Sequence, residues 1–275
     1  MPMKTKLILV EGIQGSGKST FAKKIADFYT EHGLQANLYT EGGFHPADLA
    51  WNACIPVETL SRVLAPYSGF REEIDKNTHI EDGYAIISYT QVKTDNKAFF
   101  KDMENHEVYD NRVPLDVFNG LHRSRWRAFG EQAKRKNALN VFECALLQNH
   151  VTELMYFHIA DDETMKMHFN TLIQTVTALS PFLIYLTQPN IRDTIERVAD
   201  ERGDWINRFI HYAENSPYGK LYGLKGFDAA ISCLEERKRM ELDVISSLPI
   251  ASVILENPNY DWETLWESLV NNLPI

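Results

Sequence analysis

The segment from residue 6 to residue 20 constrains the fold of this chain more than any other. Residues 6–10 (KLILV) form a short apolar run bounded by charge and glycine, which predicts a buried central strand. The loop Gly12-Ile13-Gln14-Gly15-Ser16-Gly17-Lys18-Ser19 follows, and a helical spacing of apolar residues comes after it, with Phe21, Ile25 and Phe28. A strand, a Gly-x-x-x-x-Gly-Lys-Ser loop and a helix in this order fit the Walker A pattern. The segment therefore predicts an α/β fold with a phosphate-binding loop.

The chemistry of this loop points to a bound nucleotide. Glycines let backbone N–H groups turn toward phosphate oxygens without a Cβ in the way, and the following helix N-terminus adds partial positive charge. Lys18 can bridge the terminal phosphates, and Ser19 offers a hydroxyl ligand for Mg²⁺. A glycine-rich turn capped by Ser19 is the structural alternative, which the strand–loop–helix context disfavours. We therefore expect ATP and Mg²⁺ as cofactors, with nucleotide contacts from Gly12, Gln14, Gly15, Ser16, Gly17, Lys18, Ser19 and Thr20.

Four further apolar runs predict the rest of the sheet. They cover residues 36–40, 139–142, 181–187 and 250–255, and helical sequence separates them. Parallel strands need such crossovers, and a sheet covered on both faces explains why the runs are nearly continuous. The predicted fold class is α/β, a P-loop NTPase of Rossmann-like three-layer αβα type. It has a five-stranded, mostly parallel sheet and a last helix over about 261–273 that packs back on the sheet.

The block between the second and third strands predicts a large, mainly helical insertion. Residues 44–137 contain a strand or hairpin around 84–92, a polar segment near 93–111 and a helix over about 114–136. Insertions at the carboxyl ends of strands are where such folds build substrate sites. We expect one domain over residues 1–275, with a core of 1–43 and 138–275, a substrate-side insertion of 44–137 and a lid of about 189–225.

Charge and composition exclude several classes of protein. With 28 Lys plus Arg against 38 Asp plus Glu, the net charge of −10 disfavours a nucleic-acid partner. Apolar runs are far shorter than the ~18 residues that a membrane span needs. Three widely spaced cysteines give neither a zinc motif nor a disulfide framework, so we expect a cytoplasmic protein. A homodimer is compatible with all of this.

Two absences narrow the class of nucleotide-binding protein. Guanine-specific proteins carry Asn-Lys-x-Asp after a strand, whereas here Asn96-Lys97 is followed by Ala98-Phe99 in what reads as a polar loop. The extended Walker B strand and sensor motifs of large motor and transporter ATPases are not recognisable either. A small kinase remains the best interpretation.

The chain resembles the P-loop nucleoside and nucleotide kinases, the group that includes thymidylate kinase, deoxynucleoside kinases and chloramphenicol phosphotransferase. The resemblance rests on the Walker A loop, on residues 39–43 (YTEGG), on residues 142–144 (FEC) and on the arginines after the fourth strand. It extends to the Asn257-Pro258 turn and the last helix, but residues 44–137 match nothing in that group. The Walker A loop is its one highly specific motif.

The resemblance implies roles for several residues outside the loop. Glu41, at the end of the second strand, is the first choice for the base that accepts the proton of the acceptor hydroxyl, and Asp48 is the alternative. Glu143 would bind Mg²⁺ together with Ser19. Arg197 and Arg202 would neutralise charge on the transferred phosphoryl group, as arginine fingers do. Arg192 and Asn257 are further candidate nucleotide contacts. The alternatives without a catalytic role are a solvent-facing turn carboxylate at Glu41 and a solvated helix with ion pairs such as Asp193–Arg197.

Two departures from that group bear on the acceptor. Cys144 follows Glu143 where deoxynucleoside kinases have arginine, and Thr40 precedes Glu41 where thymidylate kinases have arginine. Those arginines commonly hold a phosphate on the acceptor, so we expect a neutral or cationic acceptor. The predicted function is transfer of the γ-phosphoryl group of ATP to a hydroxyl of a nucleoside-, sugar- or antibiotic-like small molecule. The alternatives are a nucleoside monophosphate or 5′-hydroxyl polynucleotide kinase, and a nucleotide-gated regulatory or toxin-type module that binds a protein.

Overall fold

A computed structural model describes residues 4–274 and divides the chain into two compact units. Unit 1 comprises residues up to Thr40 together with Arg127 onward, and unit 2 comprises Glu41–Trp126. Helix α5 (Leu115–Ala133) runs through the boundary between them. The predicted insertion covers 44–137, whereas unit 2 begins at Glu41 and ends at Trp126, within α5.

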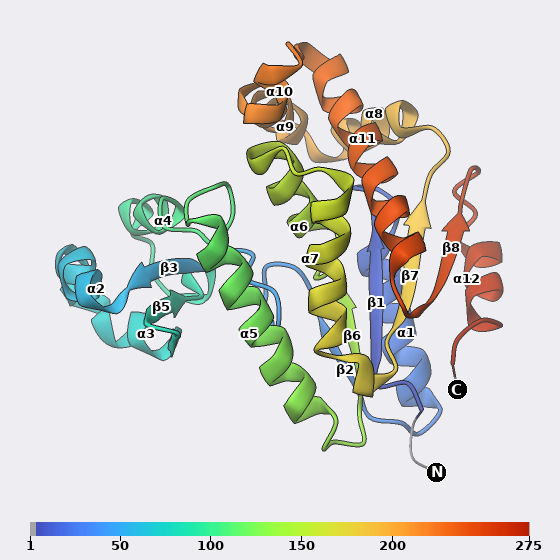
Figure 1. Cartoon of the computed structure of the whole chain (residues 1–275), viewed down its shortest axis with the longest axis horizontal. Coiled ribbons are helices and arrows are strands. Elements are labelled where there is room, and N and C mark those ends of the chain that lie inside the picture. The colour runs from blue at the N-terminus through green and yellow to red at the C-terminus, as the bar shows by residue number, and fades with distance from the viewer. Residues whose placement is uncertain (1–3, 275) are drawn as a thin grey trace. The chain divides into compact units, whose positions relative to one another are not determined.

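Unit 1 is built on a five-stranded sheet in which every neighbouring pair is parallel (Figure 1). The strand order is β2-β6-β1-β7-β8, so the strand that precedes the glycine-rich loop is central. The strands are β1 (Leu7–Gly12), β2 (Ala36–Tyr39), β6 (Leu139–Glu143), β7 (Phe182–Thr187) and β8 (Ala251–Glu256). All five predicted strands are confirmed to within two residues at each end, as is the α/β fold class.

Helices cover both faces of this sheet. One face buries Ile8, Val10 and Ile184 against α1 (Lys18–Glu31) and α12 (Trp262–Val270), which confirms the predicted packing of the last helix. The other face carries Tyr185, whose hydroxyl donates to Glu241 of α11 (Gly226–Ser247). The remaining helices of unit 1 are α6 (Gln148–Thr152), η3 (Glu153–Phe157), α7 (Asp162–Gln174), η4 (Thr177–Leu179), α8 (Ile191–Arg202), α9 (Trp205–Asn215) and α10 (Pro217–Leu221).

Unit 2 has a three-stranded antiparallel sheet of its own, in the order β3-β5-β4. The strands are β3 (Ala53–Pro56), β4 (Thr78–Glu81) and β5 (Tyr84–Ile87), and the helices are α2 (Val57–Leu64), η1 (Ala65–Phe70), α3 (Arg71–Lys76), η2 (Tyr89–Gln91) and α4 (Lys97–Glu104). Residues Asp82 and Gly83, both at positive φ, turn the hairpin between β4 and β5. The predicted strand or hairpin around 84–92 is confirmed as a strand in its first half, β5, whereas its second half contains the short helix η2 and the hairpin is made with β4.

The interpretation of Asn96-Lys97 as part of a polar loop is wrong. The side chain of Asn96 accepts from the backbone N–H of Phe99 and so caps the start of α4. Phe99 and Met103 of that helix are fully buried in the core of unit 2. The Asn96-Lys97 dipeptide accordingly begins a helix and does not lie in a loop.

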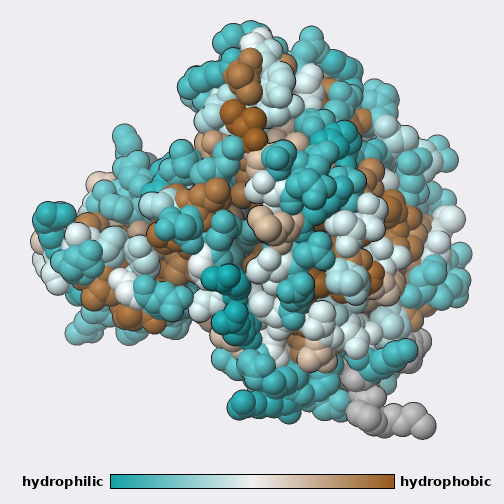
Figure 2. Space-filling model, viewed as in Figure 1, coloured by the Kyte–Doolittle hydropathy of each residue, from teal (hydrophilic) through white to brown (hydrophobic). Residues whose placement is uncertain are grey.

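The visible surface carries both polar and apolar side chains. Figure 2 shows hydrophilic and hydrophobic side chains interspersed over the visible face. Among residues 4–274, none of the helices combines the length and the apolar character needed to cross a membrane.

Candidate nucleotide and acceptor sites

The glycine-rich loop of residues 12–17 lies at the carboxyl end of β1 and leads into α1, and its glycines are required by sterics. A Cβ on Gly12, which has φ +141°, would lie 2.1 Å from the backbone oxygen of Leu186 on β7. A Cβ on Gly17, at φ +89°, would lie 2.6 Å from the ring of Trp262. The loop therefore threads between β7 and the start of α12, where only glycine fits.

Lys18 is held over this loop. Its ammonium group donates to the carbonyl oxygen of Ile13 at 2.7 Å, and Ser16 Oγ donates to the same oxygen at 2.8 Å. The Lys18 side chain is only 7% exposed, so its charge is held beside the loop backbone and out of bulk water. A lysine in this position can meet the negative charge of phosphate groups that the loop amides bind.

Ser19 and Glu143, the two predicted metal ligands, are in direct contact. Ser19 Oγ donates to Glu143 Oε1 at 2.9 Å, although the two residues are 124 positions apart in sequence. Glu143 ends β6 and is 6% exposed. A hydroxyl and a carboxylate that meet at a phosphate-binding loop are the kind of oxygen ligands Mg²⁺ uses, so these residues fit a magnesium ion.

Cys144 also contacts this carboxylate. Its Sγ donates to Glu143 Oε1 at 3.3 Å, and its backbone has φ +62°. The thiol is 1% exposed. Cys144 is thus a buried small residue beside the Glu143 carboxylate.

The three lid arginines lie along α8 and have different partners. Arg192 pairs with Asp228 at 2.5 Å near the start of α11, and Arg202 is the exposed last residue of α8. The Arg197 guanidinium lies 3.4 Å from the ring centre of Tyr260, which follows β8. The helix is also joined to that loop by a 3.0 Å hydrogen bond between Thr194 Oγ1 and the Tyr260 hydroxyl. The arginines are therefore spread along the helix.

Helix α8 also contacts the glycine-rich loop, because a Cβ on Gly15 would lie 2.5 Å from Val198. Asn257, the other candidate nucleotide contact, is 4% exposed, and its backbone N–H donates to the Thr187 carbonyl at 3.2 Å. The residues predicted to contact nucleotide outside the loop thus lie on α8 and on the turn after β8. Thr20 is exposed in the first turn of α1.

A buried ion pair that contacts the loop was not predicted from the sequence. Arg237 of α11 is 1% exposed, and it donates to Gln14 Oε1 of the loop at 2.9 Å. Its Nε lies 3.1 Å from Glu241 Oε1, and Glu241 is fully buried. In sequence, Arg237 and Glu241 are an ordinary i, i+4 pair of the kind found on solvated helices, so no local signal marked them.

Glu11 links β1 to the segment that follows Glu143. Its carboxyl group accepts from the backbone N–H groups of Leu146 at 2.7 Å and Gln148 at 3.3 Å. Complete burial, together with the nearby negative charge of Glu241, raises the pKa of Glu11 to about 8 against the pull of the backbone donors. Glu11 therefore keeps its proton at neutral pH.

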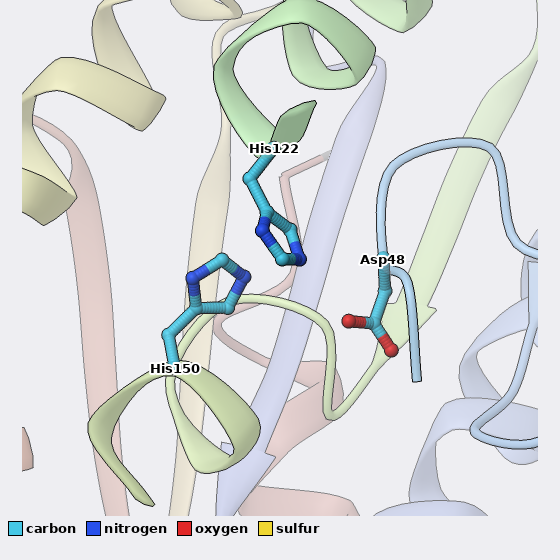
Figure 3. Close-up of side chains that lie close together, drawn as sticks. All are labelled: Asp48, His122 and His150. Carbon is cyan, nitrogen blue, oxygen red and sulfur yellow. The ribbon is translucent and has the colours of Figure 1, made fainter. Parts of the chain in front are cut away.

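Both candidate bases belong to unit 2 and differ in environment. Glu41 is exposed in a turn, whereas Asp48 is 3% exposed and accepts from the Tyr109 hydroxyl at 2.7 Å. Burial raises the pKa of Asp48 to about 6, partly offset by the hydrogen bond from Tyr109. Figure 3 shows Asp48 on its loop and His122 on α5; His150, also drawn there, belongs to α6 of unit 1.

The loop that carries Asp48 is organised by His45. The Nδ1 atom of His45 accepts from the backbone N–H groups of Ala47 at 3.1 Å and of Asp48 at 2.7 Å. Burial, with the charge of Arg125, lowers the pKa of His45 to about 3, so this ring is neutral. A neutral imidazole that accepts two amide hydrogens fixes the backbone at Asp48.

No family model matches the chain, and no curated protein matches it in sequence. Among solved structures, it is similar to thymidylate kinase from Candida albicans, with 13% identity over 98% of this chain and 92% of that chain and a TM-score of 0.40.

Proposed function

We propose that this protein is an ATP- and Mg²⁺-dependent kinase that transfers the γ-phosphoryl group to a hydroxyl of a small molecule. The contact between Ser19 Oγ and Glu143 Oε1 carries the proposal. It joins the last residue of a Gly-x-x-x-x-Gly-Lys-Ser loop to an acidic strand end, so phosphate and metal ligands meet at one edge of the sheet.

The residues of unit 1 supply binding and charge. Backbone N–H groups of residues 15–20 and the N-terminus of α1 hold the phosphates, and Lys18 neutralises the terminal ones. Ser19 and Glu143 hold Mg²⁺, which when bound withdraws negative charge from the phosphate oxygens. Arg197, which stacks on Tyr260, and Arg202 stand on the helix that contacts the loop, where they would meet charge that develops on the transferred group.

The base is a carboxylate, either Glu41 or Asp48. As the acceptor oxygen bonds to the γ-phosphorus, its proton passes to a carboxylate. The position after Glu143 holds the Cys144 thiol and not a cationic side chain, which favours an acceptor without a phosphate of its own. Nucleosides, sugars and hydroxylated antibiotics are acceptors of this kind.

The test is ADP release from Mg-ATP across pooled acceptors. The pools are nucleosides, nucleoside monophosphates, sugars, aminoglycosides, other hydroxylated antibiotics and 5′-hydroxyl oligonucleotides. Stimulation by a neutral or cationic pool in the wild type, and its loss in Lys18→Ala, is the expected result. Lys23→Ala is the matched control, because Lys23 lies on the same helix and pairs only at the surface with Asp27.

Three outcomes would contradict parts of this proposal. Stimulation by monophosphates or oligonucleotides would support the kinase activity but contradict the proposed class of acceptor. Tight ATP binding without stimulation by any pool would favour a nucleotide-gated module that binds a protein. Turnover that survives Lys18→Ala would remove the loop from the reaction altogether.

A further inference from the structure

Two neighbouring residues of the glycine-rich loop, Ile13 and Gln14, are held by helix α11. Residues Ile231, Leu234 and Arg237 follow one another on this helix at intervals of three, so they lie along one side of it. Ile13 is fully buried in an apolar cluster that includes Ile231 and Leu234. One turn further along α11, Arg237 donates to Gln14 Oε1 at 2.9 Å. Successive turns of α11 therefore hold successive residues of the loop.

Arg237 is itself fixed by contacts with its own helix and, through them, with the sheet. Its Nε lies 3.1 Å from Glu241 Oε1, one turn along α11. Glu241 Oε2 accepts from the hydroxyl of Tyr185, on the central part of β7, at 2.5 Å. All three side chains are buried, with Arg237 at 1% exposed and the other two at 0%. The guanidinium group that meets the loop is thus connected to the sheet through Glu241 and Tyr185.

A buried ion pair is not the most stable way to fill the space between a helix and a sheet. The loss of hydration of two charges offsets much of their attraction, and well-packed apolar side chains are often as stable. Apolar side chains cannot, however, make a directed hydrogen bond. A guanidinium group only donates, and its N–H groups have fixed directions, so the oxygen and not the nitrogen of the Gln14 amide faces Arg237. The ion pair therefore fixes the orientation of one side chain of the loop.

The peptide group between Ile13 and Gln14 is also held from within the loop. The carbonyl oxygen of Ile13 accepts from Lys18 Nζ at 2.7 Å, from Ser16 Oγ at 2.8 Å and from the Ser16 backbone N–H at 3.3 Å. The backbone N–H groups of residues 15–20, to which the proposed function assigns phosphate binding, begin directly after Gln14. Contacts that fix Gln14 therefore restrict the backbone just before the groups that bind phosphate.

We propose that Arg237 is a positioning residue, which holds the glycine-rich loop through Gln14 in its phosphate-binding conformation before the nucleotide arrives. The inference rests on the proposed kinase function and deepens it. A loop that is already ordered in the free protein loses little conformational entropy when a ligand binds, so its affinity for the ligand is higher. The guanidinium group of Arg237 is engaged with Gln14 and Glu241. Arg237 therefore acts on the affinity for ATP and not on phosphoryl transfer itself.

Arg237→Lys separates this role from the contribution of the ion pair to stability. Lysine keeps a positive charge beside Glu241, but its ammonium group is a compact charge on a shorter side chain and cannot contact Glu241 and Gln14 together. The Kd of Mg-ATP in calorimetric titrations should rise about tenfold or more, because a hydrogen bond from a charged donor is lost. The kcat at saturating ATP and acceptor should change less than about threefold, since the interaction is the same in the ground state and the transition state.

A double-mutant cycle tests whether Arg237 acts through Gln14. Gln14→Met keeps the length of the side chain, removes the acceptor oxygen and leaves the ion pair between Arg237 and Glu241 in place. If the two side chains act as one unit, Arg237→Lys combined with Gln14→Met should raise the Kd of Mg-ATP no further than the larger single change. Arg239→Met is the matched control, because Arg239 lies on the same helix and pairs at the surface with Asp162 and Glu236. Its Kd should stay within about twofold of the wild type.

The proposal is overturned if folded Arg237→Lys binds Mg-ATP within about twofold of the wild type, or if the effects of Arg237→Lys and Gln14→Met on Kd multiply in the double variant. A large loss of kcat at saturating ATP would also overturn it, because the effect would then belong to the transition state. Should Arg237→Lys fail to fold, Gln14→Met decides, since an unchanged Kd in that variant refutes a role for this contact.

Hydrogen exchange of the free, full-length protein separates failure of this proposal from failure of the kinase function. If the wild type binds no Mg-ATP, or if no acceptor stimulates ADP release, the kinase proposal fails, but the exchange rates still test the support of the loop. The expected result is faster exchange over residues 12–17 in Arg237→Lys and in Gln14→Met than in the wild type and in Arg239→Met. Exchange over these residues that neither variant changes refutes positioning by Arg237.

Discussion

Replacement of Arg237 by methionine tests how the glycine-rich loop is supported. Arg237 is 1% exposed, its Nε lies 3.1 Å from Glu241, and its guanidinium donates to Gln14 of the loop at 2.9 Å. Methionine fills most of the volume and removes the charge. Glu241, which is fully buried, keeps only the hydrogen bond from Tyr185, at 2.5 Å, among these partners.

The size of the effect follows from the charge that is left behind. Removing one partner of a buried ion pair costs about 3–5 kcal/mol, because the other charge stays in a poorly polarisable interior. The loss should therefore be about 3–5 kcal/mol at pH 7.

Urea unfolding of the wild type and the variant at pH 7 measures this difference. Arg239→Met is the matched control, because Arg239 lies two residues away on α11 and pairs with Asp162 and Glu236 while half exposed. Exposed ion pairs contribute about 0–1 kcal/mol, so the control should lose no more than that at any pH. A loss below about 1 kcal/mol in Arg237→Met at pH 7 would refute the reasoning.

Three further predictions concern the same region. Gly17→Ala should abolish ATP binding and lower the melting temperature, because the new Cβ would lie 2.6 Å from Trp262. Gly33→Ala is the control: Gly33 is also at positive φ but has open space around it, so this variant should lose only about 1 kcal/mol of stability to backbone strain. Ser19→Ala should remove the Mg²⁺ dependence of ATP affinity in calorimetric titrations, whereas Thr30→Ala on the same helix should keep it. Glu11→Gln should flatten the pH dependence of unfolding. Burial raises the pKa of Glu11 from 4.5 to about 8, so between these values the unfolded chain loses a proton that the folded chain keeps, and stability falls as pH rises by up to about 1.4 kcal/mol per pH unit. An undiminished slope in Glu11→Gln would contradict this assignment.

The sequence alone determined the core of unit 1. Buried parallel strands are short apolar runs because both of their faces are covered, so the pattern places all five of them. The loop of residues 12–17 can also be predicted from the sequence, since its glycines are required by the backbone conformation and by close neighbours. Helix α4 shows the limit of this reasoning. Asn96 caps the start of this helix although its surroundings in the sequence are polar, and Phe99 is buried because the other elements of unit 2 surround it.

Only the tertiary structure decided which ionisable groups are buried and what they contact. Ser19 and Glu143 lie 124 positions apart, and their 2.9 Å hydrogen bond exists because β6 is the neighbour of β1 in the sheet. Arg237 and Glu241 have the spacing of a surface pair, yet α11 buries both against the loop. Asp48, Tyr109 and His122 share no motif at all. The ionisation of a side chain depends on the dielectric and on the charges around it, and the fold supplies these from distant parts of the chain.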